Sequence, residues 1–120
     1  DFTQAALLRD AVQELQQAPS LSPAGMTRLG VCLYLIGKFR EAESALKQSD
    51  GGALAQYYLG RVCFELEEYD RALGYYDAAE NSGYTAEWCQ LCRAEVLRYQ
   101  GKKEEALKIL DNIFGPVEQH

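Results

Sequence analysis

Apolar residues recur with helical spacing along almost the whole chain. They fall at steps of three and four residues, as in Leu59, Val62, Cys63 and Leu66, and again in Tyr69, Ala72, Leu73, Tyr76 and Ala79. Such spacing places each set on one face of a helix. The sequence predicts seven helices, over residues 2–18, 23–36, 39–48, 53–66, 69–81, 85–100 and 103–114. We therefore expect an all-α fold.

Short turns divide these helices into hairpins. The turns within the hairpins are Ile36-Gly37-Lys38, Leu66-Glu67-Glu68 and Gln100-Gly101-Lys102. Gly37 and Gly101 suit the left-handed backbone that ends many helices. Between hairpins, residues 49–52 and 81–84 break the apolar pattern. Pro23 after Ser22 is typical of a helix start, and Gly115-Pro116 ends the last predicted helix.

The hairpins repeat one another. Leu29-Gly30 and Ala42 recur as Leu59-Gly60 and Ala72, and more loosely as Ala94 and Ala106, so the alanines give periods of 30 and 34 residues. Ala11, Leu15 and Ala18 have the spacing of Ala72, Tyr76 and Ala79, which makes the first helix the second half of a preceding hairpin. We expect one domain over residues 1–120, with a half repeat at 2–18 and units at 23–50, 53–82 and 85–114.

The spacing of small and large residues resembles the tetratricopeptide repeat, a 34-residue helical hairpin. In the second unit Leu59-Gly60 matches the close helix contact, Tyr69 and Tyr76 match the bulky positions, and Ala72 and Ala79 match the small ones. The first unit is four residues shorter, and the third has Gln90 and Arg93 where apolar residues are usual. The resemblance implies a right-handed α-solenoid of antiparallel hairpins, with about three units and an N-terminal half repeat.

The resemblance also implies a concave surface, lined by the first helix of every hairpin, on which protein partners bind. Units of this kind stack because one hairpin cannot bury its apolar stripe alone. The expected inward-facing residues are Thr27, Val31 and Tyr34 in the first unit, Leu54, Tyr57, Tyr58, Arg61, Phe64 and Glu65 in the second, and Trp88, Leu91, Cys92, Glu95, Arg98 and Tyr99 in the third. Tyr, Trp and Arg dominate binding hot spots. For any single aromatic residue, packing between hairpins is an equal alternative.

Some members of this family grip the C-terminal carboxylate of chaperone tails with lysine, asparagine and arginine side chains. The corresponding positions here look like Thr27, Val31, Tyr58, Trp88 and Cys92, which cannot form that clamp. We therefore expect the groove to bind an extended segment or a helix with apolar anchors. An acidic group of that partner would meet Arg61 or Arg98.

Composition and charge narrow the classes of partner. With 48% hydrophobic residues, 25% charged residues and three prolines, the chain has the profile of a folded protein. Twelve basic and eighteen acidic residues leave a net charge of −6, which disfavours nucleic acid as a partner. No apolar stretch approaches the roughly 18 residues that span a bilayer, so membrane insertion is not expected. The chain begins at Asp1 without methionine, and we interpret it as a processed or excised piece.

Four cysteines lie inside the helical patterns, at Cys32, Cys63, Cys89 and Cys92. Buried cysteine usually acts as a small hydrophobe, which favours a reducing, cytoplasmic compartment. Cys89 and Cys92 share the spacing of thioredoxin-like active sites, but that chemistry needs the first cysteine at a helix N-terminus after a strand. Cys32 and Cys63 have unsuitable spacing for a zinc site, and the one histidine is His120. We expect neither a metal nor a cofactor.

No other group of residues suggests catalysis. Ser44 and Thr85 lack a histidine partner in the predicted helices, and Glu67-Glu68 and Glu104-Glu105 suit the positive ends of helix dipoles. The sequence therefore predicts a protein that is not an enzyme and that binds other proteins. The alternative is a structural segment of a longer repeat array, which self-associates through its end helices. Phe2, Leu7 and Leu8 are the candidates for such an exposed apolar patch.

Overall fold

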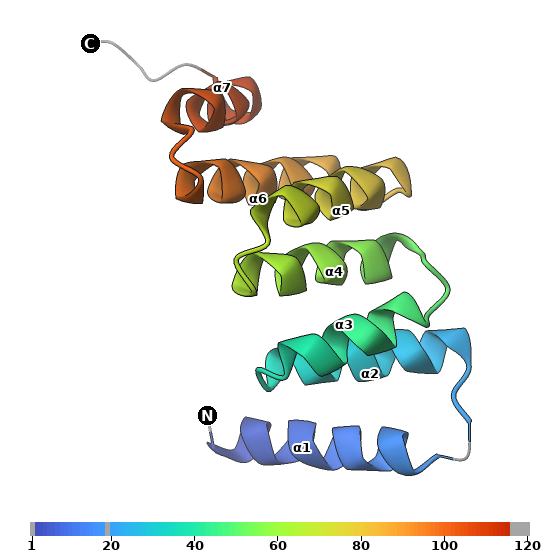
Figure 1. Ribbon diagram of the computed structural model, residues 1–120. Coiled ribbons are helices and arrows are strands. Elements are labelled where there is room, and N and C mark those ends of the chain that lie inside the picture. Colours follow the sequence, from blue (N-terminus) through green and yellow to red (C-terminus); the bar gives the residue numbers. More distant parts are fainter. Residues whose placement is uncertain (1, 19, 116–120) are drawn as a thin grey trace.

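The computed structural model describes residues 2–18 and 20–115, and among these it contains helices and no strand. The helices are α1 (Phe2–Gln17), α2 (Pro23–Leu35), α3 (Phe39–Lys47), α4 (Ala53–Glu65), α5 (Tyr69–Asn81), α6 (Ala86–Tyr99) and α7 (Lys103–Phe114). They form an elongated stack with α1 at one end and α7 at the other (Figure 1). Each helix lies within one residue of its predicted range. The predictions for Pro116 and His120 fall outside the described residues.

The helix boundaries follow from local chemistry. The Ser22 hydroxyl accepts a hydrogen bond from the Gly25 amide at 3.0 Å and caps α2, while Pro23 fills the first helical position. Inside the hairpins, Gly37 and Gly101 adopt φ angles of 86° and 80°, and Glu67 holds the same place in the second hairpin with φ at 60°. Three equivalent turns therefore form, although one of them places a glutamate in the left-handed region that favours glycine.

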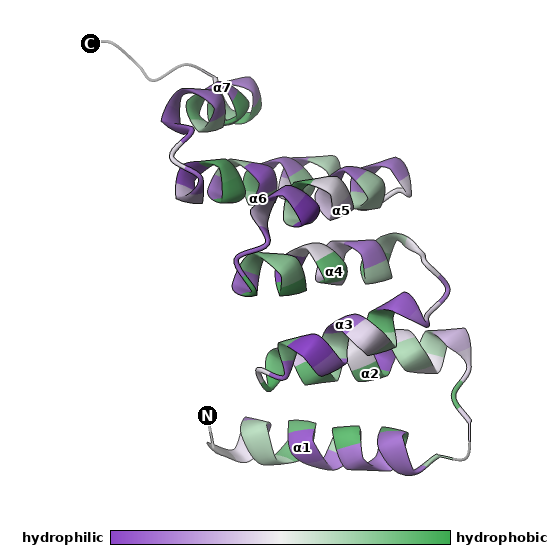
Figure 2. Ribbon diagram, viewed as in Figure 1, coloured by the Kyte–Doolittle hydropathy of each residue, from purple (hydrophilic) through white to green (hydrophobic). Residues whose placement is uncertain are grey.

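Helices α2 and α3, α4 and α5, and α6 and α7 pair as hairpins. We call the interface of the α2–α3 hairpin with α4 the first seam and that of the α4–α5 hairpin with α6 the second seam. Apolar and polar residues alternate around each helix (Figure 2), so every helix can pack on one side and meet water on another. Gly60 allows the close contact in the second hairpin, since a Cβ atom there would lie 2.5 Å from the Tyr76 ring.

The core becomes thinner toward α7. The first cluster joins α1 to α4 around Val12, Leu33, Leu46, Leu59 and Val62. The second cluster joins α4, α5 and α6 around Tyr57, Cys63, Tyr76, Cys89, Cys92 and Val96. The third contains only Ala94, Leu97 and Ala106 as buried members. The packing is that of a chain of stacked units, in which each helix pair depends on its neighbours for burial.

Candidate partner-binding groove

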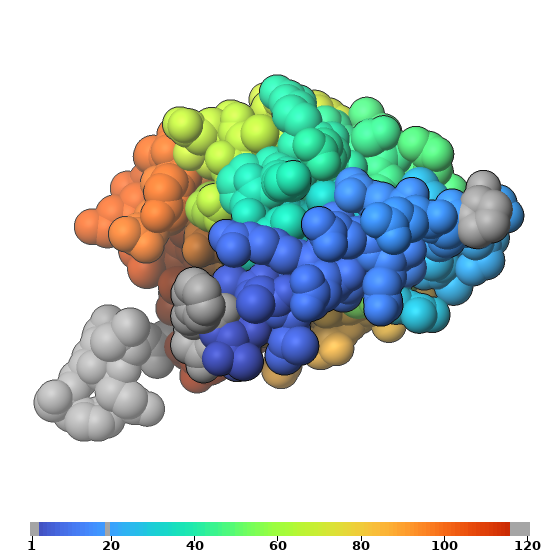
Figure 3. All heavy atoms as spheres, turned by 90° about the horizontal axis from the view of Figure 1, so that it is seen from below, coloured from blue at the N-terminus to red at the C-terminus, as the bar shows by residue number. Residues whose placement is uncertain are grey.

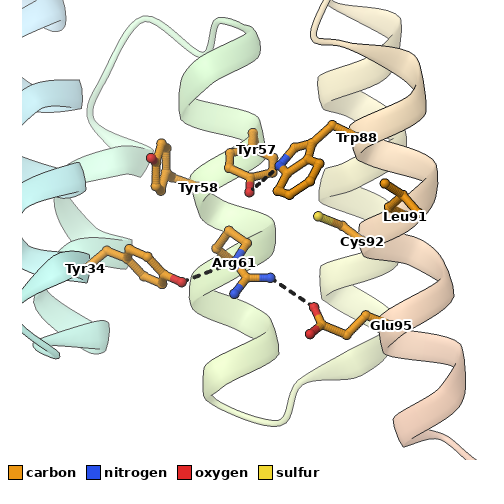
Figure 4. Close-up of a pocket in the computed structure, with 8 residues that line it drawn as sticks. All are labelled: Tyr34, Tyr57, Tyr58, Arg61, Trp88, Leu91, Cys92 and Glu95. Carbon is orange, nitrogen blue, oxygen red and sulfur yellow. Dashed lines mark hydrogen bonds and ion pairs between the residues drawn. The ribbon is translucent and has the colours of Figure 1, made fainter.

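Helices α2, α4 and α6 together line an open hollow of about 480 Å³, which we call the central groove. Figure 4 shows its side chains converging from the three helices. The lining residues are Tyr34 from α2, Tyr57, Tyr58 and Arg61 from α4, and Trp88, Leu91, Cys92 and Glu95 from α6. All eight belong to the residues that the sequence predicts to face inward, so the structure gathers them at one place.

Arg61 is held in the groove from both sides. Its Nε atom donates a hydrogen bond to the Tyr34 hydroxyl at 3.2 Å, and its Nη1 atom lies 3.0 Å from a carboxylate oxygen of Glu95 (Figure 4). The guanidinium also lies 5.5 Å from the centre of the Phe64 ring. Arg61 therefore presents a fixed and neutralised charge, and its remaining N–H groups can bond to a ligand.

Aromatic side chains form the wall beside Arg61. Tyr57 stacks on Tyr84 with ring centres 4.5 Å apart and meets Tyr58 edge to face at 5.0 Å. The Trp88 indole N–H donates a hydrogen bond to the Tyr57 hydroxyl at 2.7 Å. Burial raises the pKa of Tyr57, so its hydroxyl stays neutral near pH 7. Trp88 is 48% exposed while Tyr57 is only 7% exposed, so Trp88 is the aromatic surface that a partner can reach.

The other predicted partner-binding residues lie elsewhere. Thr27 and Val31 line a second hollow of about 430 Å³ with Leu54, and the Thr27 hydroxyl donates to its own helix at the Pro23 carbonyl. Arg98 lines a third hollow, between α6 and α7. The Phe64 ring packs against Tyr69 and Tyr99 instead of lining the central groove.

Sequence reasoning missed three residues at these surfaces. Tyr84 lies in the turn before α6, outside any helical period, yet it supports Tyr57 by ring stacking. Arg28 and Asp50 line the second hollow beside Thr27. Arg28 could have been found because it lies three residues before Val31, on the same face of the helix, whereas Tyr84 and Asp50 belong to connections for which periodicity gives no signal.

The paired cysteines of α6 lie in an environment that suppresses thiolate formation. Cys89 is completely buried and Cys92 nearly so, and both pack in the second core cluster. Burial raises the pKa of Cys89 to about 11 and also raises the pKa of Cys92. Thiol–disulfide exchange needs a thiolate, so this geometry opposes the redox interpretation of their spacing. All four cysteines are free thiols.

A cluster of possible ligand atoms in the first seam is already occupied by cations. The ligand atoms of Glu43, Cys63 and Glu68 lie within 4.8 Å of one another. Glu43 pairs with Arg71 at 2.6 Å and with Lys47 at 3.3 Å, and Glu68 pairs with Arg40 and Arg71. These side chains hold the carboxylate oxygens that a metal ion would need, so the cluster is an ion-pair network joining α3 to the start of α5.

The same network shifts the acidities of its carboxyl groups. Burial alone would raise the pKa of Glu43, but hydrogen bonds from Arg71 and Lys47 outweigh that effect and the pKa is lowered. Hydrogen bonds from Arg40 and Arg71 likewise lower the pKa of Glu68. Glu68 thus pairs with two arginines, beyond the helix-dipole role expected for it. Both carboxylates are charged at neutral pH.

Two further observations concern the chain as a whole. Within the described residues, none of the helices has both the length and the hydropathy that crossing a membrane requires. No protein-family model matches the sequence, and a comparison with curated protein sequences also gives no match.

Solved structures, in contrast, share the fold. One crystal structure of MamA is 21% identical in sequence, with a TM-score of 0.79 over 92% of this chain and 68% of the other. A second MamA structure is 18% identical, with a TM-score of 0.79 over 99% of this chain and 74% of the other. MamA contains tetratricopeptide repeats. The chain therefore has a tetratricopeptide-type fold of stacked helical hairpins, as its spacing of small and large residues predicts.

Proposed function

We propose that this chain is a protein-interaction module that holds an extended peptide or a helix of a partner in the central groove. The observation that carries the proposal is the convergence of aromatic and apolar side chains from three helices around Arg61. The hydrogen bonds of Arg61 and Tyr57 fix these side chains before any ligand arrives. Such preorganisation lowers the entropic cost of binding.

The chemistry of the groove favours an apolar anchor on the partner. Trp88 and Leu91 offer apolar surface, while Glu95 already neutralises Arg61. A partner carboxylate at Arg61 would compete with Glu95, so charge alone gives little gain there. An aromatic or branched aliphatic side chain that packs against Trp88, beside a polar group that bonds to Arg61, uses both parts of the surface.

The test is protein capture with a matched pair of variants. Trp88→Ala removes the accessible aromatic side chain of the groove, whereas Tyr99→Ala removes a 55% exposed aromatic side chain from the same helix, outside the groove. A protein captured from cell extract by the native chain is then purified and its affinity for each variant measured. We expect Trp88→Ala to weaken binding about 30-fold and Tyr99→Ala to leave it nearly unchanged. Equal affinities for the two variants would contradict the proposal.

A second role, self-association through the N-terminal end, is supported by the surface of α1. Leu7 is 64% exposed, and Leu8 lines a shallow hollow with Leu35. The space-filling view toward this end shows α1 lying across the face (Figure 3). Sedimentation equilibrium tests this role, because a dimer built on α1 becomes a monomer in Leu7→Asp. A native chain that is monomeric at high concentration contradicts it. The side chain of Phe2 lies outside the described set.

The proposal includes neither a catalytic step nor a cofactor. Three of the four free thiols are buried in the helix core, where a disulfide with another molecule cannot form without opening the stack. We therefore infer a reducing compartment, in agreement with a cytoplasmic location. The buried thiols should not react with a mild oxidant while the chain is folded. The melting temperature of the folded chain should therefore be the same before and after such treatment.

A further inference from the structure

The second hollow and the central groove adjoin each other. Helices α2 and α4 contribute side chains to both. Leu54 lines the second hollow, and Tyr58, one helical turn later on the same face of α4, lines the central groove. Figure 4 shows Tyr58 extending from α4 toward the helix that carries Tyr34. A single segment of a partner can therefore reach both hollows.

The repeat register shows that the two hollows are the same position in successive units. Four lining residues of the second hollow have counterparts among the lining residues of the central groove. The periods of 30 and 34 residues relate Thr27 to Tyr57, Arg28 to Tyr58, Val31 to Arg61 and Leu54 to Trp88. Because the axes of helices that pack together lie about 8–10 Å apart, we expect corresponding points of the two hollows to be separated by about 10 Å.

Each hollow combines apolar surface with a balanced pair of charges. Leu54 in the second hollow is 46% exposed, so its side chain is open to a partner. The charged residues that line the hollows are Arg28 and Asp50 in the second hollow and Arg61 and Glu95 in the central groove. Each hollow therefore has one charge of each sign, which favours a partner segment with uncharged, apolar anchors.

The border between the two hollows offers hydrogen-bond donors. The Tyr58 ring meets Tyr34 and Tyr57 edge to face, but its hydroxyl makes no hydrogen bond to another residue that the structure describes. Beside it, Arg61 has N–H groups beyond the two that bond to Tyr34 and Glu95. Both groups can donate to a ligand. An extended segment has free backbone carbonyls to accept these bonds, whereas the carbonyls of a helix are bonded within the helix.

We propose that the second hollow and the central groove together bind an uncharged, proline-rich segment in the polyproline II conformation, with large apolar side chains three residues apart. This inference rests on the proposed function of the central groove and specifies its partner. Polyproline II repeats every three residues, so side chains i and i+3 point the same way about 9 Å apart. In a β-strand, side chains on one face are about 7 Å or about 13 Å apart, which fits the separation of the hollows less well. Aromatic surfaces such as Trp88 also pack well on proline rings.

Three synthetic peptides test the spacing and the conformation. The first is a peptide of nine residues with leucine at its fourth and seventh positions and proline at all remaining positions. The second has the same composition with leucine at its fourth and sixth positions. The third is a lactam-stapled helix with leucine at positions i and i+7, which are about 10.5 Å apart.

We expect the first peptide to bind the full chain about tenfold more tightly than the second, which can place only one leucine in a hollow. It should bind about threefold more tightly than the helix, which lacks free carbonyls. Equal affinities of the first two peptides would overturn the proposal. Tighter binding of the helix, or no binding of the first peptide at millimolar concentration, would overturn it equally.

Matched variants of the chain locate the contacts. Leu54→Ser removes an exposed leucine from the second hollow, whereas Leu107→Ser removes a leucine of nearly equal exposure, 45%, from α7. Leu54→Ser should weaken binding of the first peptide about fivefold, and Leu107→Ser should leave it unchanged. Tyr58→Phe deletes only the hydroxyl and should weaken it about threefold. Circular dichroism checks that each variant stays helical. An unchanged affinity in Leu54→Ser or in Tyr58→Phe would contradict the proposal.

The captured partner keeps this inference and the proposed function apart. If Trp88→Ala weakens its binding while Leu54→Ser changes nothing, the central groove is the binding site and the segment across two hollows is wrong. If Trp88→Ala leaves partner binding unchanged, the proposed function fails, and this inference fails with it. Weaker binding of both the partner and the first peptide in each variant would support both proposals.

Discussion

The second and third hairpins carry the same pattern of residues but have different surroundings. In the second hairpin α6 covers the outer face, and Ala72 and Tyr76 are completely buried. In the third, Ala106 is still buried, but Leu110 is only partly buried at an open hollow and Leu107 is exposed. The repeat position thus decides toward which side a residue points. The presence of the next helix decides how deeply that residue is buried.

The two seams also differ in chemistry. The first is bridged by the ion-pair network of Arg40, Glu43, Glu68 and Arg71. The second is joined by aromatic packing, by hydrogen bonds such as that from Trp88 to Tyr57, and by two separate ion pairs, Arg61 with Glu95 and Arg93 with Asp77. The pKa values of Glu43 and Glu68 are lowered in the first network, so we expect acidification to weaken the first seam.

The largest expected effect is at the paired positions Tyr76 and Leu110. Tyr76→Ala should lower the free energy of unfolding by about 3–5 kcal/mol, because it leaves a cavity in a closed core. Leu110→Ala should cost about 1–2 kcal/mol, since its site already opens to solvent. Urea denaturation measures both. Tyr76→Phe is the control, because the Tyr76 hydroxyl makes no hydrogen bond and its loss should cost little. Equal losses of unfolding free energy at the two positions would contradict the view that a covering helix determines how much a side chain contributes.

The second largest loss of stability is expected at Gly60, whose counterpart in the third hairpin is Ala94. Gly60→Ala should destabilise the chain by about 1–2 kcal/mol, because the new methyl group meets the Tyr76 ring and the clash outweighs the gain in helix propensity. In a Tyr76→Leu background, which copies the Leu110 side of the third hairpin, the same change should cost less. Thermal unfolding of the native chain, the two single variants and the double variant gives the coupling free energy between positions 60 and 76. A Gly60→Ala chain that is more stable than the native one would contradict the packing.

A smaller effect is expected from the ion pairs of the first seam, because solvent screens pairs that lie at the surface. The folded-state pKa values of Glu43 and Glu68 lie below the ordinary glutamate value of 4.5, so the unfolded chain binds more protons near this pH. Their contribution is present above about pH 4.5 and is lost as pH falls through the folded-state values. The melting temperature should therefore fall on acidification, and less steeply in Glu43→Gln. An identical pH profile in this variant would exclude Glu43 as a source.

The smallest effect is a gain in stability at the turn of the second hairpin. Glu67→Gly should stabilise the chain by about 0.5–1 kcal/mol, because φ at this position is 60° and glycine holds it in the other two hairpins. Glu67→Ala keeps the strained backbone and is the control. The free energy of unfolding of both variants, measured in guanidinium, separates the effect of removing the backbone strain from the effect of removing the charge. Equal stabilisation by alanine would favour the charge explanation.

Much of the fold could be predicted from the sequence because helical periodicity and turn chemistry are local. Leu59, Val62 and Cys63 mark one helix face, and Gly37 and Gly101 mark the turns, so the helices were placed within one residue. The hairpin stack followed from the recurrence of Ala42, Ala72 and Ala106. These features need no knowledge of distant contacts.

The depth of each side chain could not be predicted in this way. Tyr57 and Tyr58 are neighbours on α4 and were both assigned to the groove, yet Tyr57 is buried by stacking on Tyr84 from a turn 27 residues away. Phe64 follows the same period but packs against Tyr99 of α6. Periodicity gives the direction of a side chain, whereas its exposure depends on what the next hairpin places over it.

The most direct test of the central groove uses Trp88, the one tryptophan of the sequence. Its indole N–H already bonds to Tyr57 inside the groove, so its NMR signal and its fluorescence report on this site alone. When the binding segment of a captured partner is titrated into the native chain, the indole signal should shift and the emission should move to shorter wavelength, both saturating with the measured affinity. If binding saturates while the signal and the emission of Trp88 stay unchanged, the partner does not occupy the central groove.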